Sequence, residues 1–216
     1  MDLTSKDSIF GYVRMIKPDT VIHLGALTTI NACENNRELA WRTNVEGTLN
    51  LVKACEEFSS HVYFVYMSTP CVFFGDRGNY TEIDIPHPKN YYGLTKLVGE
   101  TVVRASSLTW LIVRGNFVPR VPWPYPKAFV DRFGTYLFAD ELAKGISEVM
   151  EARLTGIVHI VGDRKLSMYQ LAKINTPNVL PMTLDEYKGP PLTVDMSLES
   201  VRWKKYSLSE NRTQTR

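Results

Sequence analysis

The sequence predicts an α/β fold in which a mostly parallel sheet is covered by helices. Apolar, strand-like runs at 20–25, 61–67 and 108–113 are separated by longer stretches in which apolar residues recur at helical spacing. This alternation is typical of parallel strands that are joined by crossover helices. The runs are almost continuously apolar, as expected of strands that helices bury on both faces.

The elements can be placed in order along the chain. The first strand follows the turn signal Lys17-Pro18-Asp19, and the segment 68–89, which contains two glycines and three prolines, is expected to be a loop. Four prolines between 119 and 126 exclude a regular helix or an inner strand there. The segments expected to form strands are 20–25, 61–67, 108–113 and 156–161. The segments expected to form helices are about 35–58, 90–105, 139–152 and 167–174.

Composition limits the class of partner. The 216 residues are 44% hydrophobic and 22% charged, and the net charge is only +2. This balance is ordinary for a globular protein and gives no reason to expect nucleic acid or an anionic membrane as a partner. No apolar run reaches the roughly 18 residues of a membrane span, and no hydrophobic leader is visible, so we expect a cytoplasmic protein. Basic residues near the C-terminus, Arg212 and Arg216 among them, are expected to be solvated.

Cysteine and histidine residues give no metal-ligand pattern. Cys33, Cys55 and Cys71 are odd in number and widely spaced, so we expect reduced thiols and no bound metal. His23 and His159 lie in expected strands, and we interpret them as packed or hydrogen-bonded residues with no catalytic role.

The start of the chain differs from that of a complete nucleotide-binding sheet. Such a sheet normally opens with a strand and a glycine-rich turn that holds a pyrophosphate at a helix N-terminus. No G-x-G-x-x-G or G-x-x-G-x-x-G occurs in the sequence. We therefore expect an N-terminally truncated, doubly wound sheet of the Rossmann type, with a partial NAD(P)-binding domain over 1–118. Residues 119–216 are expected to form a small C-terminal substrate lobe that is partly interleaved with the sheet.

The strongest chemical signal is the pair Tyr92 and Lys96. The two residues stand four apart on an expected helix and therefore share one face. A phenol with a pKa of about 10 exchanges protons poorly at neutral pH, and a neighbouring ammonium is expected to lower that pKa. By itself this spacing is weak evidence, because it also occurs on ordinary solvated helix faces.

The setting of the pair strengthens the signal. Thr69 directly follows the strand at 61–67, at the end of the sheet where α/β proteins bind their ligands. A hydroxyl there can hydrogen-bond a substrate oxygen and hold it beside the phenol. The alternative interpretation is that Thr69 only caps a turn.

Five segments, taken in order, resemble the extended short-chain dehydrogenase/reductase family. Within that family the chain is most similar to the dTDP-4-dehydrorhamnose reductase branch, chiefly through residues 27–34 and the S-T-x-x-V-F pattern of 68–73. The late segment 191–197 resembles that branch more loosely. The five segments are DLT at 2–4, VIHLGALTTINACE at 21–34, NVEGTLNLV at 44–52, MSTPCVFFG at 67–75 and NYYGLTKLVGE at 90–100.

The resemblance implies reduction of a 4-keto-6-deoxy sugar nucleotide with NADP or NAD as the cofactor. Tyr92 would give the proton to the 4-keto oxygen, Lys96 would also hold the nicotinamide ribose, and Asn44 would order a relay water. The catalytic residues implied are Tyr92, Lys96, Thr69 and Asn44. The cofactor-binding residues implied are Asp2, Leu3, Gly25, Ala26, Leu27, Thr28, Tyr92 and Lys96. The substrate-binding residues implied are Thr69, Pro70, Asn116 and Phe117.

The chain departs from the pattern of that branch at two positions in the site. Pro70-Cys71 stands where the reductases usually carry Asp-Tyr, which leaves the identity of the sugar open. Asn116 precedes the aromatic residue of the substrate loop and indicates different contacts there. Trp123 and Tyr125, which lie among prolines, are consistent either with a lid over the substrate or with simple loop packing.

Two other functions stay open at this point. The chain also resembles the beta subunit of methionine adenosyltransferase, which acts through a partner and would make it a non-catalytic regulatory subunit. A sugar-nucleotide epimerase has the same fold, whereas a dehydratase would normally need acidic residues after the threonine. The oligomeric state, including a homodimer, is also left open by the sequence.

Overall fold

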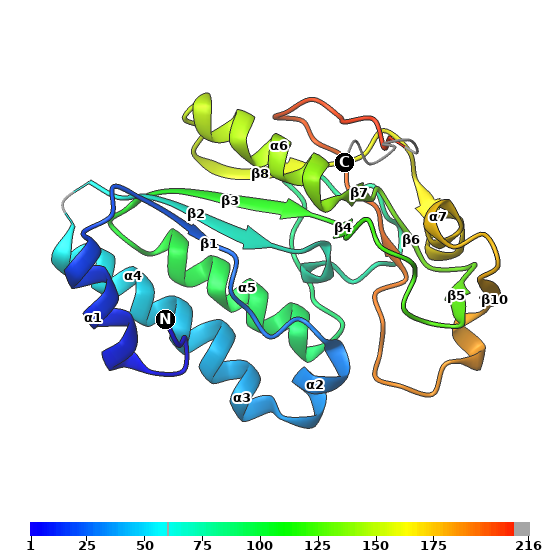
Figure 1. Ribbon diagram of the computed structural model, residues 1–216, viewed down its shortest axis with the longest axis horizontal. Coiled ribbons are helices and arrows are strands. Elements are labelled where there is room, and N and C mark those ends of the chain that lie inside the picture. Colours follow the sequence, from blue (N-terminus) through cyan, green and yellow to red (C-terminus); the bar gives the residue numbers. More distant parts are fainter. Residues whose placement is uncertain (60, 210–216) are drawn as a thin grey trace.

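A four-stranded parallel sheet forms the centre of the computed structural model, which describes residues 1–59 and 61–209. Its strands are β1 (Thr20–His23), β2 (Tyr63–Ser68), β3 (Thr109–Gly115) and β8 (Gly156–Ile160), hydrogen-bonded in the order β1-β2-β3-β8 (Figure 1). The α/β fold predicted from the sequence is thereby confirmed. Arg212 and Arg216 lie outside the described residues, so their expected solvation is not addressed.

Helices cover both faces of the sheet, and the alternation of side chains along the strands explains why. Phe64 and Tyr66 of β2 point toward one core, which they share with helices α1 (Lys6–Ile16), α4 (Gly47–Phe58) and α5 (Tyr91–Arg104). The alternating residues of β2 point toward a second core, which is closed by α6 (Ala139–Glu151) (Figure 1). All six residues of β2 are buried, as expected for a strand between two helical layers.

The long helix expected over 35–58 is divided in the structure. It consists of α3 (Arg37–Trp41), a π-helical turn (Arg42–Glu46) and α4, and it is preceded by the short helix α2 (Ile30–Asn35). In the π-helical turn the Gly47 amide donates to the Arg42 carbonyl, five residues back. A π-bulge of this kind is often found at a functional site, and this one contains Asn44.

Helix α1 was not expected from the sequence. Gly11 in its middle and the short apolar stripe weaken the sequence signal. Its ends are nevertheless well defined, because the Ser5 hydroxyl accepts from the Ser8 amide and Lys17 adopts a left-handed conformation (φ 47°) that closes the helix. Ile9 and Val13 anchor the helix in the first core.

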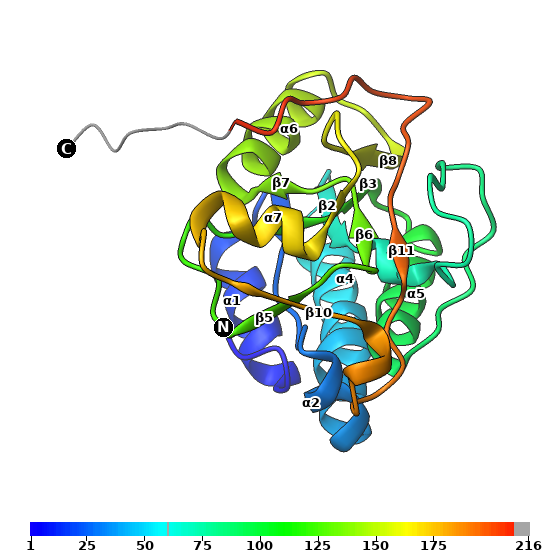
Figure 2. The ribbon, with the colours of Figure 1, turned by 90° about the vertical axis from the view of Figure 1, so that its right-hand side faces the viewer.

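The remaining elements form a small lobe beyond the carboxyl ends of the strands (Figure 2). Three small sheets pair segments that are far apart in the chain. Their strands are β4 (Phe117–Val118) with β7 (Leu137–Phe138), β5 (Lys127–Phe129) with β10 (Leu180–Met182), and β6 (Phe133–Gly134) with β9 (Leu166–Ser167) and β11 (Asp195–Met196). The other elements are α7 (Met168–Asn175) and the 3-10 turns Pro70–Val72 and Leu184–Glu186. The proline-rich stretch contains no helix, as expected.

A buried ion pair joins helix α5 to the middle of the sheet. Glu100 and Arg114 are each 1% exposed, and both carboxylate oxygens of Glu100 accept from the guanidinium, at 2.9 Å from Nε and 2.6 Å from Nη2. The Ser68 hydroxyl, at the end of β2, donates to the same carboxylate at 2.5 Å. The pair therefore fixes α5 against β2 and β3 at once.

The outer edge of β1 is not paired with another strand among the described residues. Ile22 and Leu24 are exposed there, and apolar hollows lie on both sides of the strand. No helix of the described chain combines the length and the apolar character that crossing a bilayer requires.

Substitution of Glu100 tests how strongly the buried ion pair holds the fold. Glu100→Ala leaves the Arg114 guanidinium buried without its carboxylate, so we expect the free energy of unfolding to fall by about 3–5 kcal/mol in urea titrations. The control Glu57→Ala removes an exposed carboxylate of α4 and should change it by less than about 0.5 kcal/mol. The double variant Glu100→Leu/Arg114→Met leaves no unpaired buried charge, so its free energy of unfolding should lie close to that of the wild type. Equal stability of Glu100→Ala and Glu57→Ala would contradict this account.

Candidate active site

The expected reactive residues meet where β2 ends and α5 begins. Thr69 follows the last residue of β2 and caps the 3-10 turn Pro70–Val72, with its hydroxyl accepting from the Cys71 amide at 3.2 Å. Helix α5 starts at Tyr91 because the side chain of Asn90 accepts from the Gly93 amide at 2.9 Å. Tyr92 thus lies in the first turn of α5, and its hydroxyl is within hydrogen-bonding reach of Thr69.

The close approach of α5 to the turn depends on Gly93. A Cβ at this position would lie 2.1 Å from the carbonyl oxygen of Cys71, so any side chain would push the helix away from the end of β2. The glycine between Tyr92 and Lys96 is therefore part of the geometry that holds the phenol against Thr69.

The ammonium of Lys96 does not act on Tyr92 in the way expected from the sequence. Its Nζ lies over the ring of Tyr66, 4.1 Å from the centroid, in a side chain that is almost fully buried. Burial lowers the pKa of Lys96 to about 7, although the Glu100 carboxylate acts in the opposite direction. The expected lowering of the Tyr92 pKa is not found: burial raises it, and the hydrogen bond with Thr69 offsets only part of that rise. Tyr92 is therefore a neutral phenol at neutral pH.

Asn44 ties the loop after β1 to helix α5. Its Oδ1 accepts from the Leu27 amide at 2.7 Å, and its Nδ2 donates to the Leu27 carbonyl at 3.0 Å and to the Thr95 hydroxyl at 2.9 Å. Asn44 is 1% exposed, and the π-helical turn aims its side chain at both neighbours. Both N–H groups and the oxygen of the Asn44 side chain are therefore hydrogen-bonded, and two of these three bonds fix the backbone at Leu27.

The expected cofactor-binding residues gather at the end of β1. A Cβ on Gly25 would lie 2.6 Å from Leu3 Cδ1, so Leu3 packs directly against this glycine. Asp2 accepts from the amide and hydroxyl of Thr4, both at 2.8 Å, and these hydrogen bonds lower its pKa. Gly25 and Thr28 are exposed, and Ala26 and Leu27 are partly exposed, so the backbone of 25–28 is open to a ligand.

The expected substrate-binding residues are not all in one place. Pro70 is buried beside Thr69, whereas Phe117 is 46% exposed on β4. Asn116 is partly exposed, its carbonyl accepts from the Leu137 amide, and its Nδ2 has no hydrogen-bond partner in the described chain.

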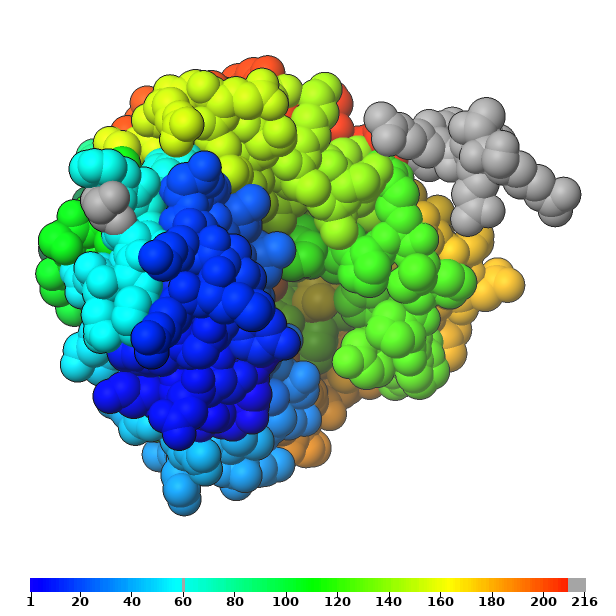
Figure 3. Space-filling model, turned by 60° about the vertical axis from the view of Figure 1, so that its left-hand side comes forward, coloured from blue at the N-terminus to red at the C-terminus, as the bar shows by residue number. Residues whose placement is uncertain are grey.

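A pocket of about 610 Å³ lies between the loop after β1 and the small lobe. The space-filling view shows the hollow between the blue N-terminal segment and the green segment that precedes β5 (Figure 3). Aromatic and methionine side chains make up much of the wall, and Arg132 contributes a guanidinium. The residues of the wall from the small lobe are Trp123, Tyr125, Pro126, Lys127, Ala128, Phe129, Arg132, Met168, Met182, Tyr187 and Leu192, and those from the other side are Thr28, Thr29, Ile30 and Asn31.

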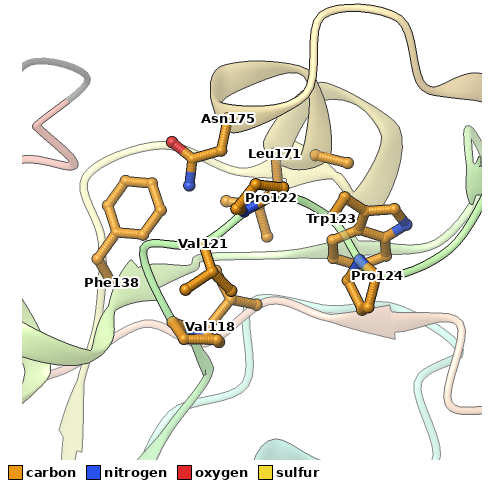
Figure 4. Close-up of a pocket in the computed structure, with 10 residues that line it drawn as sticks. Val118, Val121, Pro122, Trp123, Pro124, Phe138, Leu171 and Asn175 are labelled. Carbon is orange, nitrogen blue, oxygen red and sulfur yellow. The ribbon is translucent and has the colours of Figure 1, made fainter.

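A smaller pocket of about 170 Å³ lies under the proline-rich stretch (Figure 4). Val118, Val121, Pro122 and Leu171 give it an apolar wall, with Asn175 at one side. Trp123 borders both pockets, and its indole Nε1 donates to the Lys127 carbonyl at 3.1 Å. Trp123 therefore packs within its loop and also lines the larger pocket.

Sequence reasoning missed three residues at the site. Tyr66 provides the ring beneath the Lys96 ammonium, Thr95 connects Asn44 to the Tyr92 carbonyl at 2.8 Å, and Arg132 enters the pocket from the small lobe. Tyr66 and Thr95 occupy the positions that strand alternation and helical spacing give to core residues, so their pattern is not distinctive. Arg132 lies in a segment that had no predicted element.

The two strand histidines are structural, as expected. His23 Nε2 lies 2.9 Å from the Thr48 hydroxyl, and burial, together with the Lys96 charge, lowers the pKa of His23 to about 3. His159 is fully buried between the carbonyls of Tyr80 and Glu199. All three cysteines are free and buried, and within residues 1–59 and 61–209 no three His, Cys, Asp or Glu side chains cluster as metal ligands.

This fold and this site define a class: a Rossmann-type protein of the extended short-chain dehydrogenase/reductase kind, with tyrosine, lysine and threonine at the carboxyl edge of the sheet. A sequence profile of the RmlD substrate-binding domain matches residues 1–123, and the chain belongs to that family. The resemblance seen in the sequence is thus confirmed.

Named relatives agree with this assignment. The chain is 27% identical over 193 residues to the dTDP-4-dehydrorhamnose reductase of Aggregatibacter actinomycetemcomitans, a match that covers 80% of this chain and 65% of that protein. It is 33% identical over 125 residues to methionine adenosyltransferase 2 subunit beta of Xenopus laevis, covering 58% and 35% respectively. The chain therefore spans less than two thirds of the length of these curated relatives.

Solved structures of the same branch superpose closely. A hypothetical dTDP-4-dehydrorhamnose reductase from Sulfolobus tokodaii is 33% identical, with a TM-score of 0.80 over 94% of this chain and 78% of that chain. The reductase of Bacillus anthracis in complex with NADP is 25% identical, with a TM-score of 0.82 over 92% of this chain and 78% of that chain.

The lowered pKa of Lys96 predicts a pH dependence of stability. Between about pH 7 and the ordinary lysine pKa of 10.5, Lys96 is neutral in the folded state and charged in the unfolded state. The unfolded state then binds more protons, so the free energy of unfolding should rise with pH by about 1 kcal/mol per unit. Lys96→Met removes this rise, and urea unfolding of both proteins from pH 7 to 9 measures the difference. Parallel pH profiles of the two proteins would show that Lys96 stays charged in the folded state.

Proposed function

We propose that this chain carries the site for reduction of a 4-keto-6-deoxy sugar nucleotide with NADPH or NADH. The observation that carries the proposal is the Thr69, Tyr92 and Lys96 constellation at the carboxyl edge of the parallel sheet. The NADP complex of the Bacillus anthracis reductase, which has the same fold, supports the cofactor class. Residues 1–118 would bind the cofactor and 119–216 the sugar nucleotide.

The open backbone of 25–28 and the buried Lys96 fit the nicotinamide and ribose end of such a cofactor. Leu3 packs in the space that a side chain at position 25 would need, and Asn44 holds the Leu27 backbone in place. Bound NAD(P)H supplies the hydride to the carbonyl carbon. Within the chain, Lys96 would bind the ribose, and Asp2 and Leu3 would lie beside the adenine.

Residues of this chain position the carbonyl group and supply the proton. The Thr69 hydroxyl hydrogen-bonds the carbonyl oxygen of the sugar and holds it beside Tyr92. As negative charge develops on that oxygen, the Tyr92 phenol transfers its proton to it, so the ketone becomes an alcohol. Tyr92 carries its proton at neutral pH and can therefore act as the donor, although the burial that raises its pKa makes it a weaker acid than a free phenol. Asn44 acts as a positioning residue through Leu27 and Thr95.

Loss of NADPH or NADH absorbance with dTDP-4-keto-6-deoxy sugar as the substrate tests the proposal. Tyr92→Phe removes the proton donor and should lower kcat by about 10²–10⁴-fold. The matched control is Tyr91→Phe, because this neighbouring ring lies against the Arg37 guanidinium; the variant should keep the wild-type rate. Wild-type turnover by Tyr92→Phe would refute the proposed role. Epimerisation without net oxidation of the cofactor would favour the epimerase alternative.

A regulatory subunit is the second candidate, because the Xenopus relative is a subunit of another enzyme. It predicts no oxidoreductase turnover together with a stoichiometric complex with a methionine adenosyltransferase catalytic subunit. Size-exclusion chromatography of the mixture measures complex formation. Turnover without a complex excludes this candidate.

A further inference from the structure

Lys96 is a buried cation that has no carboxylate partner among the described residues. It is 4% exposed, and its ammonium forms no ion pair with an acidic side chain of the described chain. Glu100, one helical turn further on, directs both carboxylate oxygens to Arg114 and Ser68 instead. A buried charge normally requires compensation, because its removal from water costs free energy. Another group must therefore stabilise the ammonium.

The ring of Tyr66 lies against this ammonium. Nζ of Lys96 is 4.1 Å from the ring centroid, and Tyr66 is 0% exposed. The face of an aromatic ring carries partial negative charge, and its attraction for a cation is strongest where water is excluded. The ring thus supplies compensation that no described carboxylate provides.

Close packing fixes the Tyr66 ring in this position. A Cβ on Gly99 would lie 2.2 Å from the Tyr66 hydroxyl oxygen, so helix α5 approaches the hydroxyl where the helix has no side chain. The hydroxyl donates to the Lys96 carbonyl at 3.5 Å and is within hydrogen-bonding reach of Thr48. The centroid of the His23 ring lies 5.5 Å from that of the Tyr66 ring. Contacts from β1, α4 and α5 therefore hold the ring against the ammonium.

The titratable groups around Lys96 come from β1, β2 and α5. Burial lowers the pKa of Lys96 to about 7, and Glu100 acts in the opposite direction. Burial and the Lys96 charge lower the pKa of His23 to about 3, so this imidazole is neutral. Burial raises the pKa of the Tyr66 and Tyr92 phenols, which are neutral as well. Lys96 is therefore the group of this cluster whose charge changes near neutral pH.

The ring leaves the ammonium able to bind a ligand. Tyr66 lies in β2 three residues before Thr69, and Lys96 follows Tyr92 by one turn of α5, so both belong to the border of the proposed cofactor site. A carboxylate would accept hydrogen bonds from the ammonium, whereas a ring face balances the charge electrostatically. N–H groups of Lys96 thus remain available to the ribose hydroxyls.

We propose that Tyr66 is a positioning residue for Lys96: its ring face keeps the ammonium charged and in place for the ribose of a nicotinamide cofactor. This inference rests on the proposed function, because it concerns the same site. Tyr66 acts through Lys96 and not by contact with the substrate.

NMR titration of lysine labelled with ¹³C at Cε measures the charge of Lys96 without cofactor or substrate, and Lys96→Met identifies its signal. Tyr66→Leu removes the ring, so the titration midpoint of Lys96 should fall by about one pH unit, a tenfold change in the protonation equilibrium. Tyr66→Phe keeps the ring face and should titrate like the wild type. The matched control is Phe64→Leu, which removes another buried ring from the same strand and the same core and should leave the midpoint unchanged.

A fluorinated ring separates charge from packing. Pentafluorophenylalanine at position 66 keeps the shape of the ring and withdraws the negative charge from its face, so the Lys96 midpoint should fall as in Tyr66→Leu. This protein also supplies the test where Tyr66→Leu does not fold. Midpoints that equal the wild-type value in these proteins would overturn the proposal.

NADPH binding, followed by cofactor fluorescence at pH 7, tests the connection to the cofactor. Tyr66→Leu should weaken binding about tenfold, and Tyr66→Phe should restore it. Wild-type affinity of Tyr66→Leu, in spite of a lowered Lys96 midpoint, would refute this connection. A lowered midpoint together with no NADPH binding by the wild type would support the contact with Lys96 and refute the proposed reductase. Reduction of the sugar with unchanged midpoints would overturn the role of Tyr66 and leave the reductase intact.

Discussion

The Glu100–Arg114 ion pair is the interaction on which the rest of the molecule depends. It lies at the centre of the sheet, and through Ser68 it also reaches the end of β2. One carboxylate therefore sets the position of α5 relative to two strands. Since Tyr92 and Lys96 are carried by α5 and Thr69 follows Ser68, the distance between phenol and threonine is controlled by a contact deep in the core. Burial of the pair costs desolvation energy, which its charge-assisted hydrogen bonds offset.

The site combines this buried centre with a border that is built from short segments. Asn44 lies in a π-helical turn, and its side-chain amide is hydrogen-bonded to the Leu27 backbone and to the Thr95 hydroxyl. These hydrogen bonds fix the backbone beside the proposed cofactor. The opposite border is formed by the proline-rich stretch and the small lobe, whose strands pair in short segments. A parallel sheet with a fixed edge and a separate lobe is how α/β proteins commonly build ligand sites. Burial and neighbouring charges then set the protonation states. Tyr92 keeps its proton at neutral pH, and the pKa of Lys96 is lowered to about 7.

Much of the fold could be predicted from the sequence because its main signals are local. Continuous apolar runs indicate the strands, and apolar residues at helical spacing indicate α5. Helix α1 could not be predicted, because Gly11 interrupts its pattern and packing against α4 supplies most of its stability. The division of the helix near Asn44 is likewise a tertiary effect. The expected influence of Lys96 on Tyr92 failed because spacing gives the shared face, whereas rotamer and burial decide where the ammonium lies.

The sequence by itself determined the class of protein and the shared helix face of Tyr92 and Lys96, since a helix turn brings positions four apart together whatever surrounds them. It also located Thr69, because parallel strands end at a common edge. Only the tertiary structure decided the electrostatics of the site. Arg132 contacts Thr193, Met168 and Met196, which are 61, 36 and 64 residues away in the chain. No local sequence pattern predicts such a cluster, because the free energy of a buried charge depends on every group that the fold places around it.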